Sequence, residues 1–96
     1  MDRASILTNL RKYKERNQAK YGIQSMGIFG STARDTMSAQ SDIDIVVTLD
    51  PPDFYALIGI KNDIEEEFGR PVDIVRKRDN MNRFLKKRIE QEAIYV

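Results

Sequence analysis

The sequence predicts an α/β protein, with helices packed on a sheet and elements in the order αβαβαβα. Two patterns support this class. Apolar residues recur at helical spacing in several segments, and short β-branched runs alternate with those segments. Glycine, proline and polar clusters separate one element from the next. Because the two element types alternate along the chain, we expect a sheet covered by helices.

The first helix and the first strand are predicted by simple patterns. Apolar residues at helical spacing predict a helix over residues 5–20, namely Ile6, Leu7, Leu10 and Tyr13. Gly22 is typical of a helix stop. Residues 23–29 then form a predicted strand, which ends at the Gly-Ser pair at positions 30 and 31.

A short helix and the second strand follow this pair. We expect the helix over residues 32–37, a polar turn over residues 38–41, and a strand over residues 42–49. The strand is rich in isoleucine and valine, which favour a pleated and buried environment.

The next helix starts after this strand and extends to Phe68. Asp50 is the predicted N-cap, with the two following prolines in the first turn and Asp53 favourably placed for the helix dipole. Gly69 ends the helix. Its apolar stripe consists of Phe54, Leu57, Ile58, Ile64 and Phe68.

The last two predicted elements are a strand over residues 72–75 and a helix over residues 80–90. The residues of this helix that we expect to face inward are Met81, Phe84, Leu85 and Ile89. Four further hydrophobic residues fit either the core or a partner surface, and we favour the core: Tyr55, Ile60, Tyr95 and Val96.

Length and charge limit the number of domains and the kinds of partner that we expect. Its 96 residues fit a single domain, residues 1–96, and the net charge of +1 favours no particular partner. Charge is nevertheless segregated, because residues 50–67 are acidic and residues 76–88 are basic. These segments fit two solvated helix faces, or a basic surface that contacts a protein or a nucleotide.

The chain contains no cysteine and no histidine. This excludes disulfides, thiolate chemistry, cysteine- or histidine-based zinc sites and histidine general-base catalysis. The N-terminal apolar run is too short for a signal peptide, and no stretch approaches the ~20 apolar residues of a membrane span. We therefore expect a cytoplasmic protein that does not contact a membrane.

A Gly-Ser pair lies where a strand meets a helix start. Gly30 would let a phosphate approach the unpaired N–H groups of the helix end, the Ser31 hydroxyl adds a donor, and Arg34 follows one turn later. The same pair also fits a plain turn with an N-cap serine.

Two carboxylates begin the second strand. Asp42 and Asp44 are two residues apart, so their side chains point to the same side of the strand. Oxygen ligands in this arrangement suit Mg²⁺, which also keeps substrate phosphates in its coordination shell. Alternatively, Asp42 caps the preceding turn and Asp44 lies on a solvated face.

Asp73 repeats this pattern in the third strand, where it lies between β-branched residues. It joins the carboxylates if this strand lies beside the second, and otherwise it is a strand-edge residue. Together, a phosphate cradle and three carboxylates supply what phosphoryl or nucleotidyl transfer requires.

GSTAR at residues 30–34, SDIDIVV at residues 41–47 and the later Asp73 resemble the nucleotidyltransferase superfamily that includes DNA polymerase beta. The spacing looks most like the minimal nucleotidyltransferase (MNT) branch, and the resemblance covers about residues 10–96. It implies a small polymerase-beta-like fold, with a short mixed sheet packed with helices.

The resemblance also implies roles for individual residues. Gly30, Ser31, Arg34 and Ser41 would bind the nucleotide. Asp42 and Asp44 would hold two Mg²⁺ ions. Asp73 would complete the second metal site and help to activate the acceptor hydroxyl.

Proteins of the MNT branch commonly pair with a HEPN toxin, a helical RNase. The resemblance thus implies an antitoxin that transfers AMP from ATP to a toxin tyrosine. Two alternatives are a non-catalytic antitoxin that covers its partner, and an enzyme acting on a small molecule or a nucleic acid. Against the last alternative, we expect no second domain, and the sequence shows no strongly basic stretch studded with aromatic residues. We therefore expect no direct nucleic-acid contact.

The sequence departs from the family at one position. Asp35 follows Arg34, where the family often has glycine. An acidic residue near a bound triphosphate is unfavourable unless it points away or meets a cation.

Overall fold

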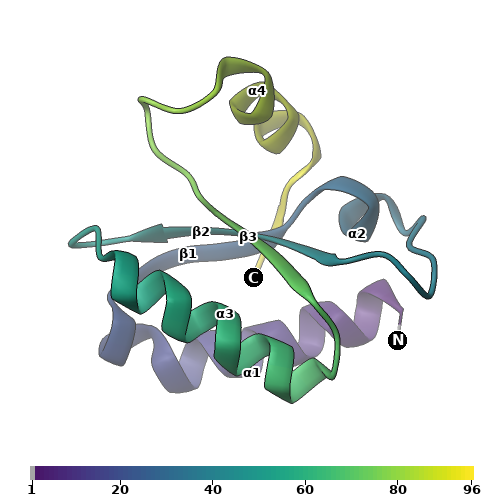
Figure 1. The fold of residues 1–96 in the computed structure, drawn as a ribbon, viewed down its shortest axis with the longest axis horizontal. Coiled ribbons are helices and arrows are strands. Elements are labelled where there is room, and N and C mark those ends of the chain that lie inside the picture. Colours follow the sequence, from purple (N-terminus) through teal and green to yellow (C-terminus); the bar gives the residue numbers. More distant parts are fainter. Residues whose placement is uncertain (1) are drawn as a thin grey trace.

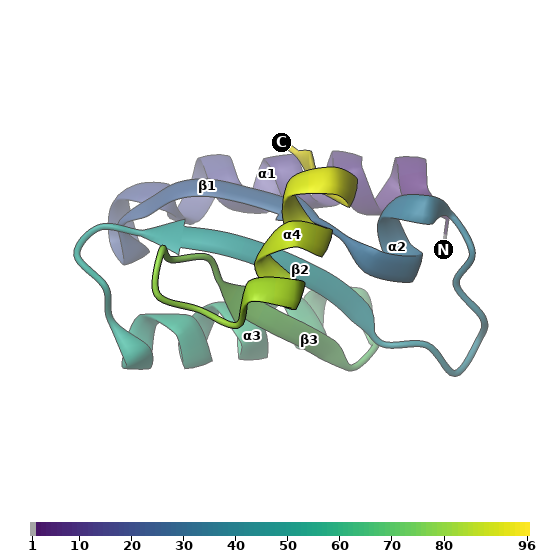
Figure 2. The ribbon, with the colours of Figure 1, turned by 90° about the horizontal axis from the view of Figure 1, so that it is seen from above.

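A computed structural model describes residues 2–96 and contains a sheet with helices on both faces. Helices α1 (Arg3–Tyr21) and α3 (Phe54–Phe68) cover one face, and α4 (Arg83–Glu92) lies over the other (Figure 1). Seen from above, α4 crosses the sheet, and the short α2 (Gly30–Arg34) lies at the end of β1 (Ile23–Ile28) (Figure 2). The α/β class predicted from the sequence is confirmed.

The sheet is mixed. Its order is β3 (Val72–Arg76), β2 (Ile43–Leu49), β1 and β4 (Ile94–Tyr95). β1 runs antiparallel to β2 and to β4, whereas β2 and β3 are parallel. The fourth strand was not predicted, because two residues are too few to show a period. It approaches β1 at Gly27, where a Cβ atom would lie 2.5 Å from the carbonyl oxygen of Ile94.

β2 divides its side chains between two apolar clusters. Ile43, Ile45 and Val47 face α1 and α3 and belong to the larger cluster. Val46 faces the other way, into a small cluster with Phe29 and Ile89 under α4. Residues at even positions of β2 therefore point to the α4 side of the sheet.

The start of α3 differs from the prediction. Asp53 is the N-cap, and its carboxylate accepts hydrogen bonds from the N–H groups of Tyr55 and Ala56 at 2.9 and 3.2 Å. The predicted cap, Asp50, instead precedes a cis bond to Pro51. Both prolines thus lie before the helix. The predicted stop at Gly69 is confirmed.

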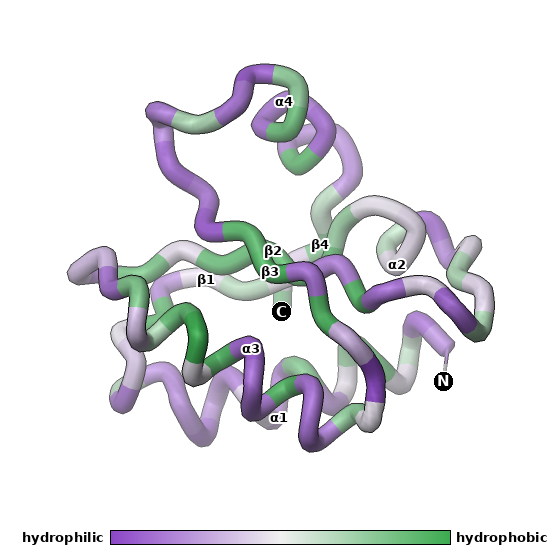
Figure 3. Tube along the Cα trace, viewed as in Figure 1, coloured by the Kyte–Doolittle hydropathy of each residue, from purple (hydrophilic) through white to green (hydrophobic). Residues whose placement is uncertain are grey.

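The buried face of α3 is also rotated from the predicted stripe. The buried residues are Ala56, Ile60, Ile64 and Phe68. By contrast, 70% of Phe54, 83% of Tyr55 and 39% of Ile58 are exposed. The predicted stripe left out Ala56 and Ile60, which lie on the buried face beside Ile64 and Phe68. Apolar segments of α3 are visible in Figure 3.

The last helix begins at Arg83, with Asn82 as its N-cap, and continues to Glu92. Ile89 is its one fully buried residue, as predicted. The prediction for Phe84 is wrong, because this residue is 75% exposed. Only a narrow stripe of α4 contacts the sheet, so a residue early in the helix escapes burial.

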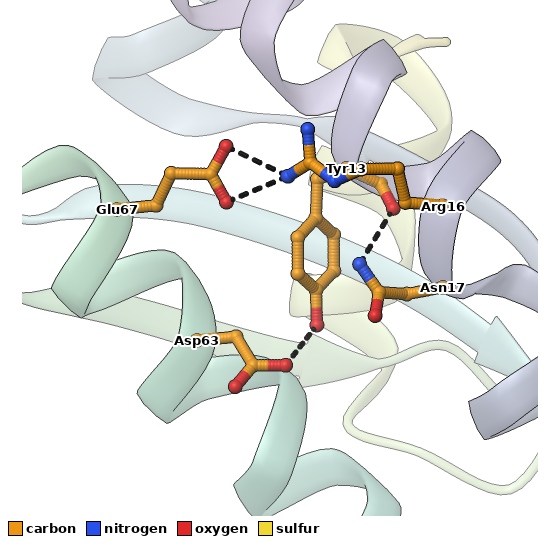
Figure 4. A network of polar contacts seen from close by, with 5 residues as sticks. All are labelled: Tyr13, Arg16, Asn17, Asp63 and Glu67. Carbon is orange, nitrogen blue, oxygen red and sulfur yellow. Dashed lines mark hydrogen bonds and ion pairs between the residues drawn. The ribbon is translucent and has the colours of Figure 1, made fainter.

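Polar contacts fasten α1 to α3. The hydroxyl groups of Tyr13 and Tyr21 both donate hydrogen bonds to Asp63, at 2.8 and 3.1 Å. Arg16 also donates two hydrogen bonds to Glu67 at 2.9 and 3.0 Å (Figure 4). Burial and the Asp63 carboxylate raise the pKa of Tyr13 above its ordinary value. The tyrosine therefore stays a neutral donor.

Among residues 2–96, no helix is both long and apolar enough to cross a membrane.

Candidate active site

Asp44 and Asp73 lie side by side on neighbouring strands. Their Cα atoms are direct partners in the parallel register of β2 and β3. Paired residues of parallel strands point to the same face of the sheet, and here that face is the α4 side. The adjacency that the sequence left open is therefore present, and Asp73 is also exposed on an edge strand.

Asp42 precedes β2 and is exposed. It is two residues before Asp44 and close enough to influence the titration of that carboxylate. Within residues 2–96, however, no group of three or more acidic side chains is placed to hold a metal ion by itself. The three carboxylates thus form an open row rather than a closed cage.

Electrostatics distinguishes Asp44 within this row. Burial raises the pKa of Asp44 above its ordinary value, and the Asp73 and Asp42 carboxylates raise it further. Arg88, which approaches from α4, and the backbone N–H of Ser31 partly offset the rise. A positive ion beside Asp44 would relieve this repulsion.

Position 30 requires a glycine because the backbone there lies close to the Asp44 side chain. The φ angle of Gly30 is +59°, and a Cβ atom at this position would lie 2.5 Å from Oδ2 of Asp44 and 3.6 Å from Nη2 of Arg88. Any other residue would be strained and would push into the carboxylate. Gly30 therefore lets the first turn of α2, the carboxylate and the arginine meet at one point.

Thr32 fixes α2 to the carboxylate strand. It is fully buried, and its hydroxyl oxygen accepts a hydrogen bond from the N–H of Asp44 at 2.9 Å. The N–H of Phe29 also donates to the carbonyl of Asp44 at 3.1 Å. The role of Thr32 was not predicted, since a threonine after Gly-Ser gives no signal of a partner 12 residues away.

Glu92 occupies the donors that the sequence assigned to phosphate. Its carboxylate accepts hydrogen bonds from the N–H of Gly30 at 3.1 Å and from Nη1 of Arg34 at 2.9 Å. The N-cap position of α2, Phe29, supplies no side-chain hydrogen bond. Glu92 therefore serves as the tertiary cap of α2. The local sequence does not predict this contact, because Glu92 and Arg34 are 58 residues apart.

The two predicted nucleotide-binding serines have different surroundings. Ser31 is the second residue of α2, so it is not the N-cap that the alternative reading required. The hydroxyl of Ser41 lies 3.0 Å from both the N–H and the hydroxyl of Ser38. Arg70 donates to the carbonyl of Ser41 at 2.6 Å. Ser41 thus closes the loop before the carboxylate strand.

Asp35 ends α2 in the left-handed region, at φ 61°. Glycine adopts this conformation without strain, which explains why a glycine suits this position. Asp35 is exposed at the C-terminal end of the helix, away from the Gly30 turn. Its side chain makes no hydrogen bond or ion pair within residues 2–96.

Comparisons with known proteins agree with this geometry. The model of the nucleotidyltransferase domain family matches residues 10–96. A Methanocaldococcus jannaschii relative assigned to the protein adenylyltransferases is 39% identical over 88 residues, 91% of this chain and 90% of its own. The protein adenylyltransferase MntA of Thermococcus cleftensis is 30% identical over 93 residues, 96% of this chain and 90% of its own.

Solved structures share the fold. A protein assigned as a minimal nucleotidyltransferase is 28% identical, with a TM-score of 0.80 over 98% of this chain and 95% of that one. The Shewanella oneidensis complex of a tri-AMPylated HEPN toxin with its MNT antitoxin has a TM-score of 0.71 at 19% identity. That match covers 97% of this chain and 70% of the other. The second likeness concerns the fold alone.

Proposed function

Because the chain belongs to the nucleotidyltransferase domain family, we propose that it transfers AMP from ATP to a tyrosine hydroxyl of a HEPN-type toxin and acts as its antitoxin. The observation that carries this proposal is the pairing of Asp44 with Asp73 beside the first turn of α2. It places carboxylates from two strands next to a glycine turn, as nucleotidyl transfer requires.

The donor set fits Mg²⁺. This ion prefers one or two carboxylates and completes its coordination with water and substrate phosphates, so an open row of carboxylates suits it better than a closed cage. Asp42 and Asp44 would hold one ion, and Asp44 and Asp73 a second. Bound there, Mg²⁺ would neutralise charge on the triphosphate and on the oxygens of the reacting centre.

The transfer itself is an in-line displacement. The oxygen of the acceptor hydroxyl forms a bond to the α-phosphorus of ATP, and the bond between that phosphorus and the bridging oxygen to the β-phosphorus breaks. Pyrophosphate leaves with this electron pair. Asp73 is exposed on the edge strand and would take the hydroxyl proton.

The remaining site residues would orient the triphosphate. Ser31 offers its hydroxyl at the start of α2, and Arg88 brings a positive charge from α4 to the same point. Gly30 and Arg34 are held by Glu92, so we assign them to shaping the turn as much as to binding phosphate. Ser41 supports the loop that leads into Asp42.

The relatives support a protein acceptor. The protein adenylyltransferase names of the two sequence relatives describe transfer of AMP to a protein. A structural neighbour of the same fold is an MNT antitoxin in complex with its tri-AMPylated HEPN toxin.

The test uses a HEPN protein that copurifies with the chain. We expect [α-³²P]ATP and Mg²⁺ to label it, with intact mass rising by one or more AMP units on a tyrosine. Asp44→Asn should reduce labelling at least about 100-fold, because a group that stabilises transition-state charge is lost. Equal labelling by Asp44→Asn would contradict the proposal.

The second candidate is an antitoxin that neutralises its partner by covering it. Two observations favour it: Glu92 already occupies Gly30 and Arg34, and α3 exposes Phe54 and Tyr55. This function predicts full neutralisation of the HEPN partner by Asp44→Asn. Loss of neutralisation by that variant, with the complex intact, would exclude it.

A further inference from the structure

The outer edge of β3 carries a row of outward-facing backbone groups. Within the described residues 2–96, β3 is an end strand of the sheet and pairs with β2 alone (Figure 2). The carbonyl of Pro71 and the N–H of Lys77 form hydrogen bonds with β2. Because alternate residues of a parallel strand face the partner strand, the backbone groups of Val72, Ile74 and Arg76 face outward.

Both ends of this row are closed, but its middle is open. The N–H of Val72 donates to Oε2 of Glu65 at 2.9 Å, and Arg78 donates to the carbonyl of Arg76 at 3.3 Å. Within residues 2–96, no hydrogen bond outside the sheet involves the backbone of Ile74. The open stretch therefore lies directly after the third carboxylate.

An apolar pocket of about 290 Å³ lies against this stretch. β3 and α3 line it with Asp73, Ile74, Phe54, Leu57, Ile58 and Lys61. Phe54 and Ile58 are both exposed, so the pocket opens to solvent through apolar groups. Grouped exposed apolar side chains beside a polar site are typical of a binding surface.

We propose that the open edge at Ile74 and this pocket together form an acceptor groove, which binds an extended segment of the acceptor protein. The inference rests on the proposed function and specifies where its acceptor binds. An extended segment can add to a sheet edge through backbone hydrogen bonds, with side-chain pockets giving specificity. The groove offers both, next to the residue that would receive the hydroxyl proton.

Alternation of side chains gives the groove a sequence preference. In an extended segment successive side chains point to opposite faces. A side chain level with Ile74 enters the pocket on the α3 side, whereas its two neighbours point to the α4 side, where Asp73 lies. The groove thus selects an apolar residue immediately next to the residue that carries the reacting hydroxyl.

The position of the groove also identifies its occupant. Asp73 lies on this edge strand and its Cα is paired with that of Asp44, so a segment bound along the edge passes beside the reacting centre, whereas the pocket lies on the α3 side of the sheet. The nucleotide is a poor occupant of the pocket, because its triphosphate belongs at the Gly30 turn beside Arg88 of α4, on the other side of the sheet. The acceptor is the remaining reactant.

The test uses peptides as the probe. Short tyrosine peptides in a polar background, with one leucine moved along the sequence, are incubated with the whole chain, Mg²⁺ and [α-³²P]ATP. We expect peptides with leucine directly beside the tyrosine to be labelled about tenfold more than those with leucine two residues away, as for one buried apolar anchor.

Two neighbouring variants separate the groove from the rest of α3. Phe54→Asp changes the pocket, whereas Tyr55→Asp changes a similarly exposed aromatic residue that lies outside it. The two rings contact each other, so each variant loses that contact. We expect Phe54→Asp to remove the preference for adjacent leucine, and Tyr55→Asp to keep it within about twofold of wild type, since it leaves the pocket unchanged.

Calorimetry of Mg²⁺·ATP binding is run on all three proteins and should give equal affinities. If wild type binds ATP but labels no peptide, or labels without regard to the leucine position, the groove is overturned. Equal loss of the preference for adjacent leucine in Phe54→Asp and Tyr55→Asp would overturn the groove as well. If wild type fails to bind Mg²⁺·ATP, the proposed function itself is overturned.

Discussion

Polar groups on one face of the sheet have hydrogen-bond partners, whereas those on the other face include like charges side by side. On the α1 and α3 side, Tyr13 and Tyr21 share one carboxylate, and each hydroxyl has its acceptor. On the α4 side, Asp44 is next to Asp73, and the nearby Arg88 offsets only part of the repulsion. The first face is apolar and satisfied, whereas the second concentrates like charges under a helix with a single fully buried residue.

This difference indicates a division of roles. The α1 and α3 side supplies most of the stability, because it holds the larger apolar cluster. The α4 side places charges that weaken the fold but suit a cation and a triphosphate. Such local conflict is expected at functional sites, which are rarely optimal for stability. Four substitutions test the comparison, two on each side.

The largest expected effect is on the satisfied face. Ile60→Ala leaves a cavity at a fully buried position between α3 and the sheet. We expect it to lower the free energy of unfolding by about 2 to 5 kcal/mol. Urea denaturation measures this change. If Ile60→Ala lowers the free energy of unfolding by less than the exposed control Ile58→Ala, the α1 and α3 side does not supply most of the stability.

Tyr13→Phe removes one hydrogen bond from the same face and should cost about 1 to 2 kcal/mol at neutral pH. The pKa of Tyr13 is raised on folding, so its contribution is complete below the unfolded value of 10.0 and is lost as pH rises above it. Thermal denaturation should therefore show wild type and variant converging at alkaline pH. If the stability difference between wild type and Tyr13→Phe stays the same as pH rises, folding does not hold Tyr13 neutral.

Glu92→Gln tests the cap on the other face. The variant keeps the shape of the side chain but loses the charge that holds both the Gly30 N–H and Arg34. We expect ATP binding to weaken about tenfold, corresponding to one charge-assisted hydrogen bond. The partly exposed ion pair should change stability by less than about 1 kcal/mol.

Calorimetry and thermal denaturation together decide the role of Glu92. Weaker ATP binding at nearly unchanged stability supports a residue that orders the turn. Tighter ATP binding would show instead that Glu92 competes with a phosphate for the same donors.

Asp44→Asn has the smallest expected effect on stability, and its sign is unusual. Because folding raises the pKa of Asp44, the charged form disfavours the folded state once pH exceeds that pKa. The variant should be slightly more stable than wild type at pH 7, by less than about 1 kcal/mol given its partial exposure. This gain should disappear as pH falls toward the ordinary value of 3.8. If Asp44→Asn is less stable than wild type at neutral pH, the inferred repulsion between Asp44 and its neighbouring carboxylates is wrong.

The first three strands and the neighbouring positions of their carboxylates were predictable because they depend on short, periodic patterns. Alternation in SDIDIVV fixed the side of the strand to which Asp44 points, given a buried Ile43 and Ile45. The position of Asp73 depended on the pairing of β3 with β2, which the sequence suggested only by repeating a motif.

The missed features depend on contacts between distant segments. Glu92, Thr32 and Arg88 meet the site through folding, and each looks like an ordinary polar residue in its own segment. The face of α3 was misplaced for a related reason. Spacing gives a helix its period, but neighbouring elements decide which of two adjacent apolar stripes is buried.

The most direct test of the account is calorimetric titration of ATP into the purified chain, with Mg²⁺ and then with EDTA, beside the Asp42→Asn/Asp44→Asn variant. We predict binding that requires Mg²⁺ and is lost in a variant that stays folded. No binding to the folded wild-type chain, or equal binding by the variant, would contradict the claim that the carboxylate face of the sheet is a nucleotide site.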